Sequence, residues 1–170
     1  MTADGATRRA RLSGLARFVI EIWALLGGCI LLALVLMNVE SVIASAVWGA
    51  PFPGDFEMTQ VGVAVAAFSF LPYCQLTGAN VTADIFTSGL SKRWEAIFAL
   101  VASLLALGFA LLLAWRMWAG MLDQRAYDYT TTILQFPHWI AFIPILISLA
   151  LLAVAALMTL DKAARDARET

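Results

Sequence analysis

Four long apolar runs decide what this chain can fold into. They cover about residues 18–39, 57–76, 94–120 and 137–160. A helix needs about 20 apolar residues to cross the hydrocarbon core of a bilayer, where its backbone groups must be satisfied internally. The sequence therefore predicts an all-α integral membrane protein with four transmembrane helices. We expect a single membrane domain over residues 1–170, with tails at 1–17 and 161–170.

The composition supports this fold class and narrows the partners. Hydrophobic residues make up 62% of the chain and charged residues 14%, against about 25% charged in soluble domains. No basic face is present, so we expect a lipid bilayer and no nucleic acid as partner. Cys29 and Cys74 lie in apolar runs and are interpreted as small apolar fillers, with a redox pair as the alternative. His138 is the single histidine, so no metal or other cofactor is expected.

The lysines and arginines predict the orientation. Nine of the 11 lie in the two tails or near the connection between the second and third runs, and two, Arg116 and Arg125, lie near the connection between the third and fourth. Positive charge accumulates on the cytoplasmic side. We therefore expect both termini in the cytoplasm. The basic segment from Arg8 to Arg17 leaves open a horizontal helix before the first span.

The cytoplasmic connection begins with the stretch LPYCQLTGANVTADIF at residues 71–86. Pro72 is expected to kink the second helix near its end, and Gly78 to end it in a left-handed conformation. Asn80 or Thr82 is expected to cap a short interfacial helix over residues 83–90, with Asp84 facing water. These five residues form the candidate inner-connection motif, for which we expect a structural role.

Charged residues near the opposite ends of the helices are candidates for docking a partner. Asp55 and Glu57 are expected in the first turn of the second helix, where the dipole favours acids. For Glu57 the alternative is contact with an outer partner or with an arginine. Arg116 is expected to snorkel beside two tryptophans, with a link to Asp123 or Glu40 as the alternative. The candidate periplasmic docking set consists of Asp55, Glu57, Arg116 and Arg125.

Small residues recur at helical spacing and predict close helix packing. Ala102, Ala106, Ala110 and Ala114 lie on one stripe of the third helix. Ala24 with Gly28, and Gly62 with Ala66, have the same spacing on the first and second helices. Small residues let helix backbones approach closely in lipid. The alanine stripe is either internal packing or an interface with another subunit.

Ionisable side chains are missing from the predicted middle of every helix. Coupled transporters keep polar groups or broken helices at the midplane, and none of the common catalytic motifs occurs. We therefore expect neither an enzyme nor a complete transporter.

The order of motifs resembles the small membrane subunit of tripartite ATP-independent periplasmic (TRAP) transporters, the DctQ-like family. Over about residues 18–160 the chain has GAPFPGDFE before the second helix, the inner motif after it, and LQFPHWIAFIPI opening the fourth. The inner motif is the most specific part, and its positions in the family pattern are Gly78, Asn80, Val81, Thr82, Ala83 and Asp84. Many members have histidine at the position of Asn80 and arginine at that of Thr82, which suggests a subfamily.

The resemblance implies a non-catalytic subunit in the bacterial inner membrane. A large membrane subunit of the elevator type would bind the solute, an organic acid, and Na⁺. A periplasmic solute-binding protein would deliver the solute. The small subunit would scaffold the large one and help dock the binding protein. The alternatives are an autonomous small oligomeric channel or exporter, and a membrane redox or quinone enzyme built on Cys29, Cys74 or His138.

Overall fold

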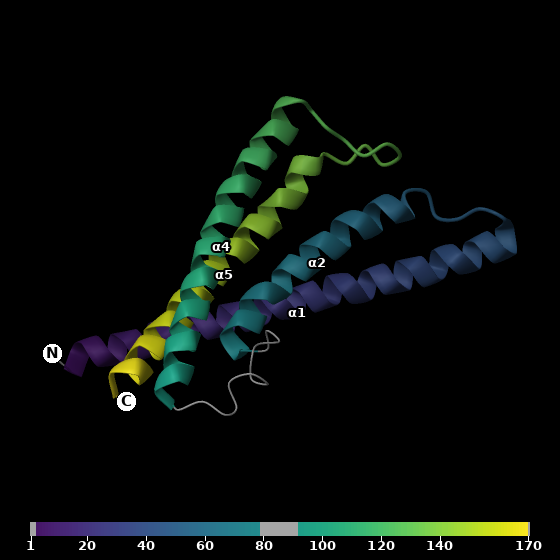
Figure 1. Cartoon of the computed structure of the whole chain (residues 1–170). Coiled ribbons are helices and arrows are strands. Elements are labelled where there is room, and N and C mark those ends of the chain that lie inside the picture. Colours follow the sequence, from purple (N-terminus) through teal and green to yellow (C-terminus); the bar gives the residue numbers. More distant parts are fainter. Residues whose placement is uncertain (1–2, 79–91, 170) are drawn as a thin grey trace.

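The fold consists of four long helices in a computed structural model that describes residues 3–78 and 92–169, with side chains for residues 11–78 and 97–165. The helices are α1 (Ala3–Trp48), α2 (Asp55–Thr77), α4 (Lys92–Ala126) and α5 (His138–Glu169) (Figure 1). Each contains a segment long and apolar enough to cross a membrane. The described residues form no strand, only an isolated bridge. The prediction of an all-helical chain with four candidate spans is confirmed.

The helices extend beyond the apolar runs that predicted them. With 46 residues, α1 is about 69 Å long, more than twice the thickness of the hydrocarbon core. Residues 3–17 continue α1 without a break. The predicted polar connection at 121–136 is shorter than expected, because α4 continues to Ala126. Residues 121–126 contain neither glycine nor proline, so nothing in them stops the helix.

Glycines in the left-handed region bound α2 at both ends. Gly54 precedes the helix with φ 81°, and Gly78 follows it with φ 68°. The Gly78 N–H donates to the Cys74 carbonyl, as expected for a glycine that closes a helix. Asp55 and Glu57 lie in the first turn, as the sequence predicts.

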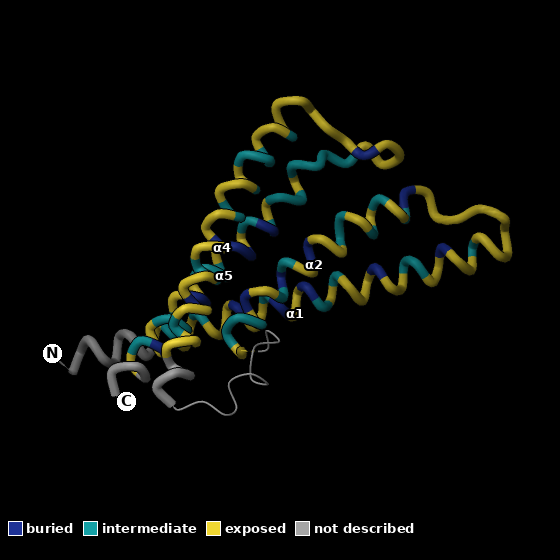
Figure 2. The backbone as a smooth tube through the Cα atoms, viewed as in Figure 1, coloured by how far each residue is buried: buried dark blue, intermediate teal, exposed yellow. Residues whose placement is uncertain are grey.

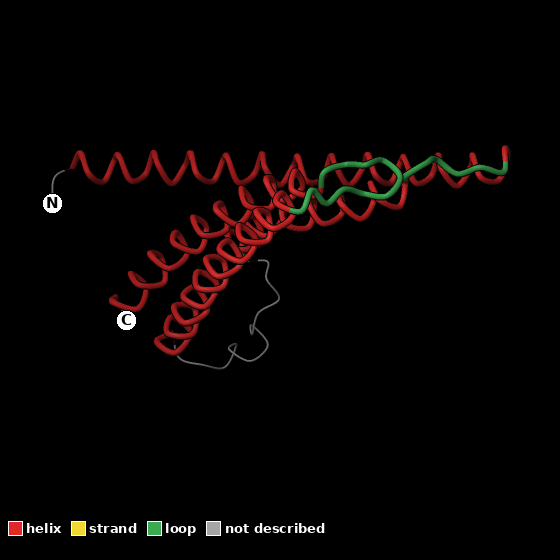
Figure 3. The backbone as a smooth tube through the Cα atoms, turned by 90° about the horizontal axis from the view of Figure 1, so that it is seen from above, coloured by secondary structure: helices red, strands yellow, loops and turns green. Residues whose placement is uncertain are grey.

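The helices form two antiparallel hairpins, α1 with α2 and α4 with α5. The hairpins are joined mainly by packing of α2 against α5. They lie together towards the chain termini and diverge towards the turn at 49–54 and the loop at 127–137 (Figure 1). Figure 3 shows from a second direction that α4 and α5 run obliquely to α1. We call the end with the turn and the loop the loop end, and the opposite end the termini end.

One narrow stripe of α1 is buried, and the rest of its surface is exposed and largely apolar (Figure 2). Ile20, Ala24, Leu34 and Ser41 lie on this stripe together with Gly27. A Cβ atom at Gly27 would lie 2.7 Å from Ser69 Cβ, so α1 and α2 approach closely there. Gly28, which the sequence pairs with Ala24, takes no part in this contact, since a Cβ at Gly28 would meet nothing of the chain within 4 Å. The buried residues of α1 recur at helical spacings of three, four and seven residues, and position 27, not 28, falls in this series.

The core lies where α2, α4 and α5 meet. Val65, Ile145 and Leu149 form its buried centre, and Leu113, Ala114 and Met117 of α4 pack against it. Within the alanine stripe, Ala110 is fully buried, Ala106 and Ala114 are half-buried, and Ala102 is exposed. Since α4 packs chiefly on α5, this stripe serves internal packing at its buried positions.

Single side-chain hydrogen bonds connect helices within the membrane-spanning part. Trp23 Nε1 of α1 donates to Ser148 Oγ of α5 at 2.8 Å. Gln75 Nε2 of α2 donates to Thr159 Oγ1 of α5 at 3.1 Å. Polar pairs of this kind hold helices together in lipid, where water does not compete for them.

Candidate functional site

Most of the described polar contacts outside the helix ladders gather at the loop end, where three segments meet. These are the turn at 49–54, the first turn of α2 and the loop at 127–137. This end contains Asp55 and Glu57 of the candidate docking set, both in the first turn of α2.

A serine of α1 fixes the turn at 49–54. The Ser41 hydroxyl donates to the Asp55 carboxylate and accepts the Phe52 N–H at 3.1 Å. Ser41 is 3% exposed, so these bonds lie at the interface of α1 and α2. The Asp55 carboxylate is therefore engaged within the chain, and it fixes how the turn leaves α1 and enters α2.

The loop at 127–137 has a compact fold of its own. Thr130 and Pro137 form an antiparallel bridge. The Thr131 N–H donates to the Phe136 carbonyl at 3.0 Å, and the Phe136 N–H donates to Thr131 Oγ1 at 2.9 Å. Asp128 and Gln135 have positive φ values of 53° and 51°. The buried Thr131 therefore organises the loop, and its tip at residues 132–134 reaches back from the α4–α5 hairpin towards α2 (Figure 1).

The Glu57 carboxylate binds the tip of this loop. It accepts the Ile133 N–H at 2.8 Å and the Leu134 N–H at 3.0 Å. Next to this pair, the Leu134 side chain packs on Gly54, where a Cβ would come within 2.5 Å of Leu134 Cγ. We call these contacts the Glu57 clamp. They connect the two hairpins at the end where the helices diverge.

A cleft of about 280 Å³ lies beside the clamp. Phe56, Glu57, Gln60 and Val61 of α2 line one side of it, and Thr130, Thr131, Thr132 and His138 line the other. His138 thus lies at the start of α5, next to the Glu57 clamp.

The two arginines of the docking set form no ion pair with the two acids. The Arg125 guanidinium lies 5.5 Å from the centroid of the Trp139 ring, a cation–π contact at the end of α4. Arg116 is exposed on α4 and forms no ion pair with any side chain that the structure describes. The alternative links from Arg116 to Asp123 or Glu40 are not formed.

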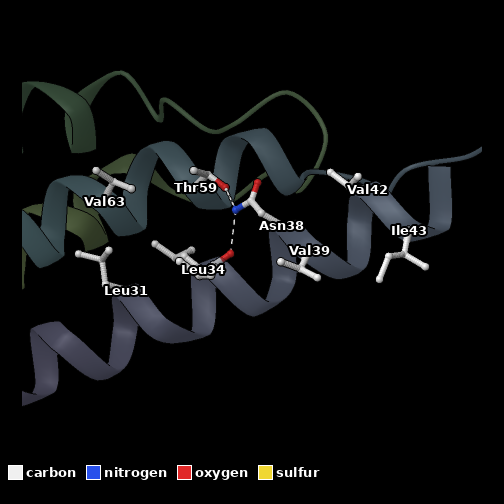
Figure 4. A pocket seen from close by; sticks show the side chains of 9 residues that line it. Leu31, Leu34, Asn38, Val39, Val42, Ile43, Thr59 and Val63 are labelled. Atoms are coloured by element: carbon white, nitrogen blue, oxygen red, sulfur yellow. Dashed lines mark hydrogen bonds between the residues drawn. The ribbon is translucent and has the colours of Figure 1, made fainter. Parts of the chain in front are cut away.

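An open apolar groove of about 470 Å³ follows α1 and α2 towards the loop end (Figure 4). It is lined by Leu31, Leu34, Val35, Val39, Val42, Ile43 and Val63, with Asn38 and Thr59. Asn38 Nδ2 donates to Thr59 Oγ1 at 2.9 Å and to the Leu34 carbonyl at 2.8 Å. The one amide of the groove is thus used to hold α1 against α2.

The inner-connection motif is described in part. Pro72 is fully buried within α2, and Gly78 ends the helix. Asn80, Thr82, Asp84 and the predicted interfacial helix lie outside the described residues, so their structural role stays a prediction.

Several residues of this architecture were missed by sequence reasoning. Ser41, Trp23 and Ser148 are isolated polar or amphipathic residues in apolar runs, and each lies on or next to a buried stripe. The sequence does carry a signal for Ser41, because it continues the seven-residue spacing of Ile20, Gly27 and Leu34. Nothing local to Glu57 indicated its backbone partners, which lie 76 and 77 positions later.

No group of three or more His, Cys, Asp or Glu side chains among the described residues could hold a metal ion. Cys29 and Cys74 are free thiols. The loop end offers hydrogen-bonding groups and exposed aromatic rings, a chemistry that suits binding a partner.

The comparison with protein families decides the assignment. The family described as tripartite ATP-independent periplasmic transporters, DctQ component, matches residues 34–166. The chain belongs to the DctQ family. This family is the small permease component of TRAP transporters, so the resemblance found in the sequence motifs is confirmed. A search of curated proteins found no match to the chain. The matched range includes the loop-end third of α1, the Glu57 clamp and most of α5.

Proposed function

We propose that this DctQ chain is a non-catalytic scaffold in a cation-coupled TRAP transporter for organic acids. In this proposal, a large elevator-type subunit binds solute and Na⁺. The small subunit widens the fixed part of that subunit and presents its loop end to a periplasmic solute-binding protein. The observation that carries the proposal is the Glu57 clamp, because it joins the two hairpins into a continuous loop-end surface.

The exposed side chains around the clamp support a docking role. Phe56, Tyr127, Tyr129 and Ile133 are 76%, 72%, 55% and 62% exposed. Aromatic residues are enriched in protein interfaces, where they bury much area at little entropic cost. The clamp orders the backbone beneath these side chains, so little conformational freedom would be lost on binding.

The distribution of charge supports the proposed orientation in the inner membrane. Nine of the 11 lysines and arginines lie at the termini end or near residues 92 and 93. With that end in the cytoplasm, the loop end faces the periplasm. The exposed apolar faces of α1 and α4 would then meet lipid or the large subunit.

Site-specific photocrosslinking in cells tests this proposal. A benzoylphenylalanine at Ile133 should form an adduct with a soluble periplasmic binding protein. Leu15 has a similar exposure, 61%, but lies at the termini end. The same probe at Leu15 should give no such adduct. Adducts with the binding protein from position 15, or none from position 133 in cells that contain the assembled transporter, would reject the docking role.

A further inference from the structure

A column of exposed residues on α4 changes in character along the helix axis. Leu105, Phe109, Leu112, Arg116 and Asp123 follow one another at spacings of four, three, four and seven residues, which places them on one face. The three apolar side chains are 68%, 66% and 58% exposed, and the arginine and aspartate are exposed as well. Towards the loop end, the exposed side chains of this face are therefore first apolar, then positively charged at Arg116 and then negatively charged at Asp123.

Arg116 lies at the edge of the hydrocarbon region. Residues 96–115 carry no charged side chain. Their length is about 30 Å at the helical rise, which is the thickness of the hydrocarbon core. The packing of α4 against α5 places Arg116 slightly inside this edge. Gly120, one turn closer to the loop end than Arg116, lies beside Phe142, which belongs to the apolar run of α5. An arginine at this depth extends its guanidinium towards the lipid headgroups, and no described carboxylate of the chain pairs with it there.

We propose that this column binds one phospholipid of the leaflet nearer the loop end. The Arg116 guanidinium binds the lipid phosphate, and an acyl chain lies along Leu112, Phe109 and Leu105. An ammonium group on the lipid headgroup points towards Asp123. The ligand is therefore a zwitterionic phospholipid with a primary amine, of the phosphatidylethanolamine type.

The dimensions and charges of the column fit this occupant. The 11 helical steps from Leu105 to Arg116 span about 16 Å, close to the roughly 15 Å of one hydrocarbon leaflet. A guanidinium presents a planar fork of N–H donors that matches a phosphate. Asp123 lies about 10 Å further along the helix, on the headgroup side. Its negative charge favours an amine headgroup over an anionic one.

The flanking residues favour lipid over a protein partner. Trp115 and Trp118, one position before Arg116 and two positions after it, are 72% and 54% exposed. Tryptophan is enriched at the level of the lipid headgroups, where its ring meets both apolar and polar groups. A membrane helix of another subunit with a carboxylate opposite Arg116 is the competing occupant.

Lipid titration of the full chain tests the proposal. The purified chain is delipidated in mild detergent and titrated with dioleoyl phosphatidylethanolamine or dioleoyl phosphatidylglycerol, and bound lipid is counted by native mass spectrometry. The ethanolamine lipid should bind more tightly. Arg116→Gln should weaken its binding about tenfold, the order expected for one lost charge-assisted hydrogen bond. Arg116→Lys, which keeps the charge, should weaken it less.

Two further variants separate the headgroup from the phosphate. Asp123→Asn should retain phospholipid but lose the preference for the amine. Arg165→Gln is the control, because Arg165 is paired with Asp161 within the chain. Unchanged binding by a folded, monodisperse Arg116→Gln variant would overturn the site. Equal binding of both lipids by the original chain would overturn the headgroup assignment.

The competing occupant gives a different result in the intact transporter. A photocrosslinker at Leu112 that labels another membrane subunit in the purified complex, with no phospholipid retained, would overturn the proposal in favour of a protein carboxylate. Crosslinking to phospholipid would support it.

Discussion

The Glu57 carboxylate accepts the backbone N–H of Ile133 at 2.8 Å, across 76 positions of sequence. With the neighbouring bond from Leu134 at 3.0 Å, it connects the start of α2 to the loop between α4 and α5. The hairpins of this DctQ chain diverge towards that end (Figure 1). The relative placement of the loop-end surfaces therefore depends on this clamp and on the packing of Leu134 against Gly54.

Glu57→Gln should loosen the loop at 127–137. The amide keeps one acceptor oxygen but loses the charge and the second acceptor, so at most one of the two N–H groups stays well paired. Hydrogen exchange of the Ile133 and Leu134 amides, followed by mass spectrometry, should become several-fold faster. Glu40→Gln removes an exposed acid from α1 and serves as the control. Equal exchange in both variants and in the original chain would show that the carboxylate does not hold the loop.

Ser41→Ala should destabilise the turn at 49–54. The change removes the donor to Asp55 and leaves the Phe52 N–H without its acceptor. A hydrogen bond contributes about 0.5–1.5 kcal/mol to stability. Equilibrium unfolding in detergent should show a loss of that order for Ser41→Ala and almost none for Ser45→Ala, since Ser45 is exposed on the same helix. A similar effect of both changes would contradict the assignment.

Gly27→Ala and Gly28→Ala form a matched pair. The new methyl group at position 27 would lie 2.7 Å from Ser69 Cβ, so α1 and α2 must separate, at a cost of about 1–3 kcal/mol. At position 28 the methyl group meets nothing within 4 Å. Helix propensity then favours alanine by about 1 kcal/mol. In thermal unfolding, Gly27→Ala should lower the melting temperature and Gly28→Ala should raise it. The reverse order would disprove the packing of α1 on α2 through Gly27.

Trp23 and Ser148 should be energetically coupled. Trp23 Nε1 donates to a hydroxyl that is 1% exposed and itself donates to the Pro144 carbonyl at 2.8 Å. Interhelical hydrogen bonds in membrane proteins average about 0.6 kcal/mol and reach about 1.7. A double-mutant cycle of Trp23→Phe and Ser148→Ala should give a coupling in that range. A coupling near zero would mean that α1 and α5 are held by apolar packing alone.

The four helices could be predicted from the sequence because a bilayer leaves few choices for apolar runs of this length. Helix ends were less accessible, since hydropathy marks where the membrane ends and not where the helix does. α4 shows this directly, continuing six residues past its predicted end to Ala126. The role of Gly78 was predictable because it is local. Helices commonly end at a residue in the left-handed conformation, which glycine adopts without steric cost.

The long-range contacts could not be predicted. The partners of Glu57 are backbone N–H groups of a distant loop, and a backbone group leaves no mark in the sequence. The choice between Gly27 and Gly28 depends on which side of α1 meets α2. Both lie at helical spacing from Ala24, so only the position of Ser69 decides between them.

The central claim is that this chain works as a subunit and not alone, and co-purification tests it most directly. The chain is tagged at its C-terminus in its native host, solubilised gently and isolated with whatever it binds. The account predicts a stoichiometric complex with a large polytopic membrane protein. An oligomer of this chain alone that conducts ions in planar bilayers would contradict it.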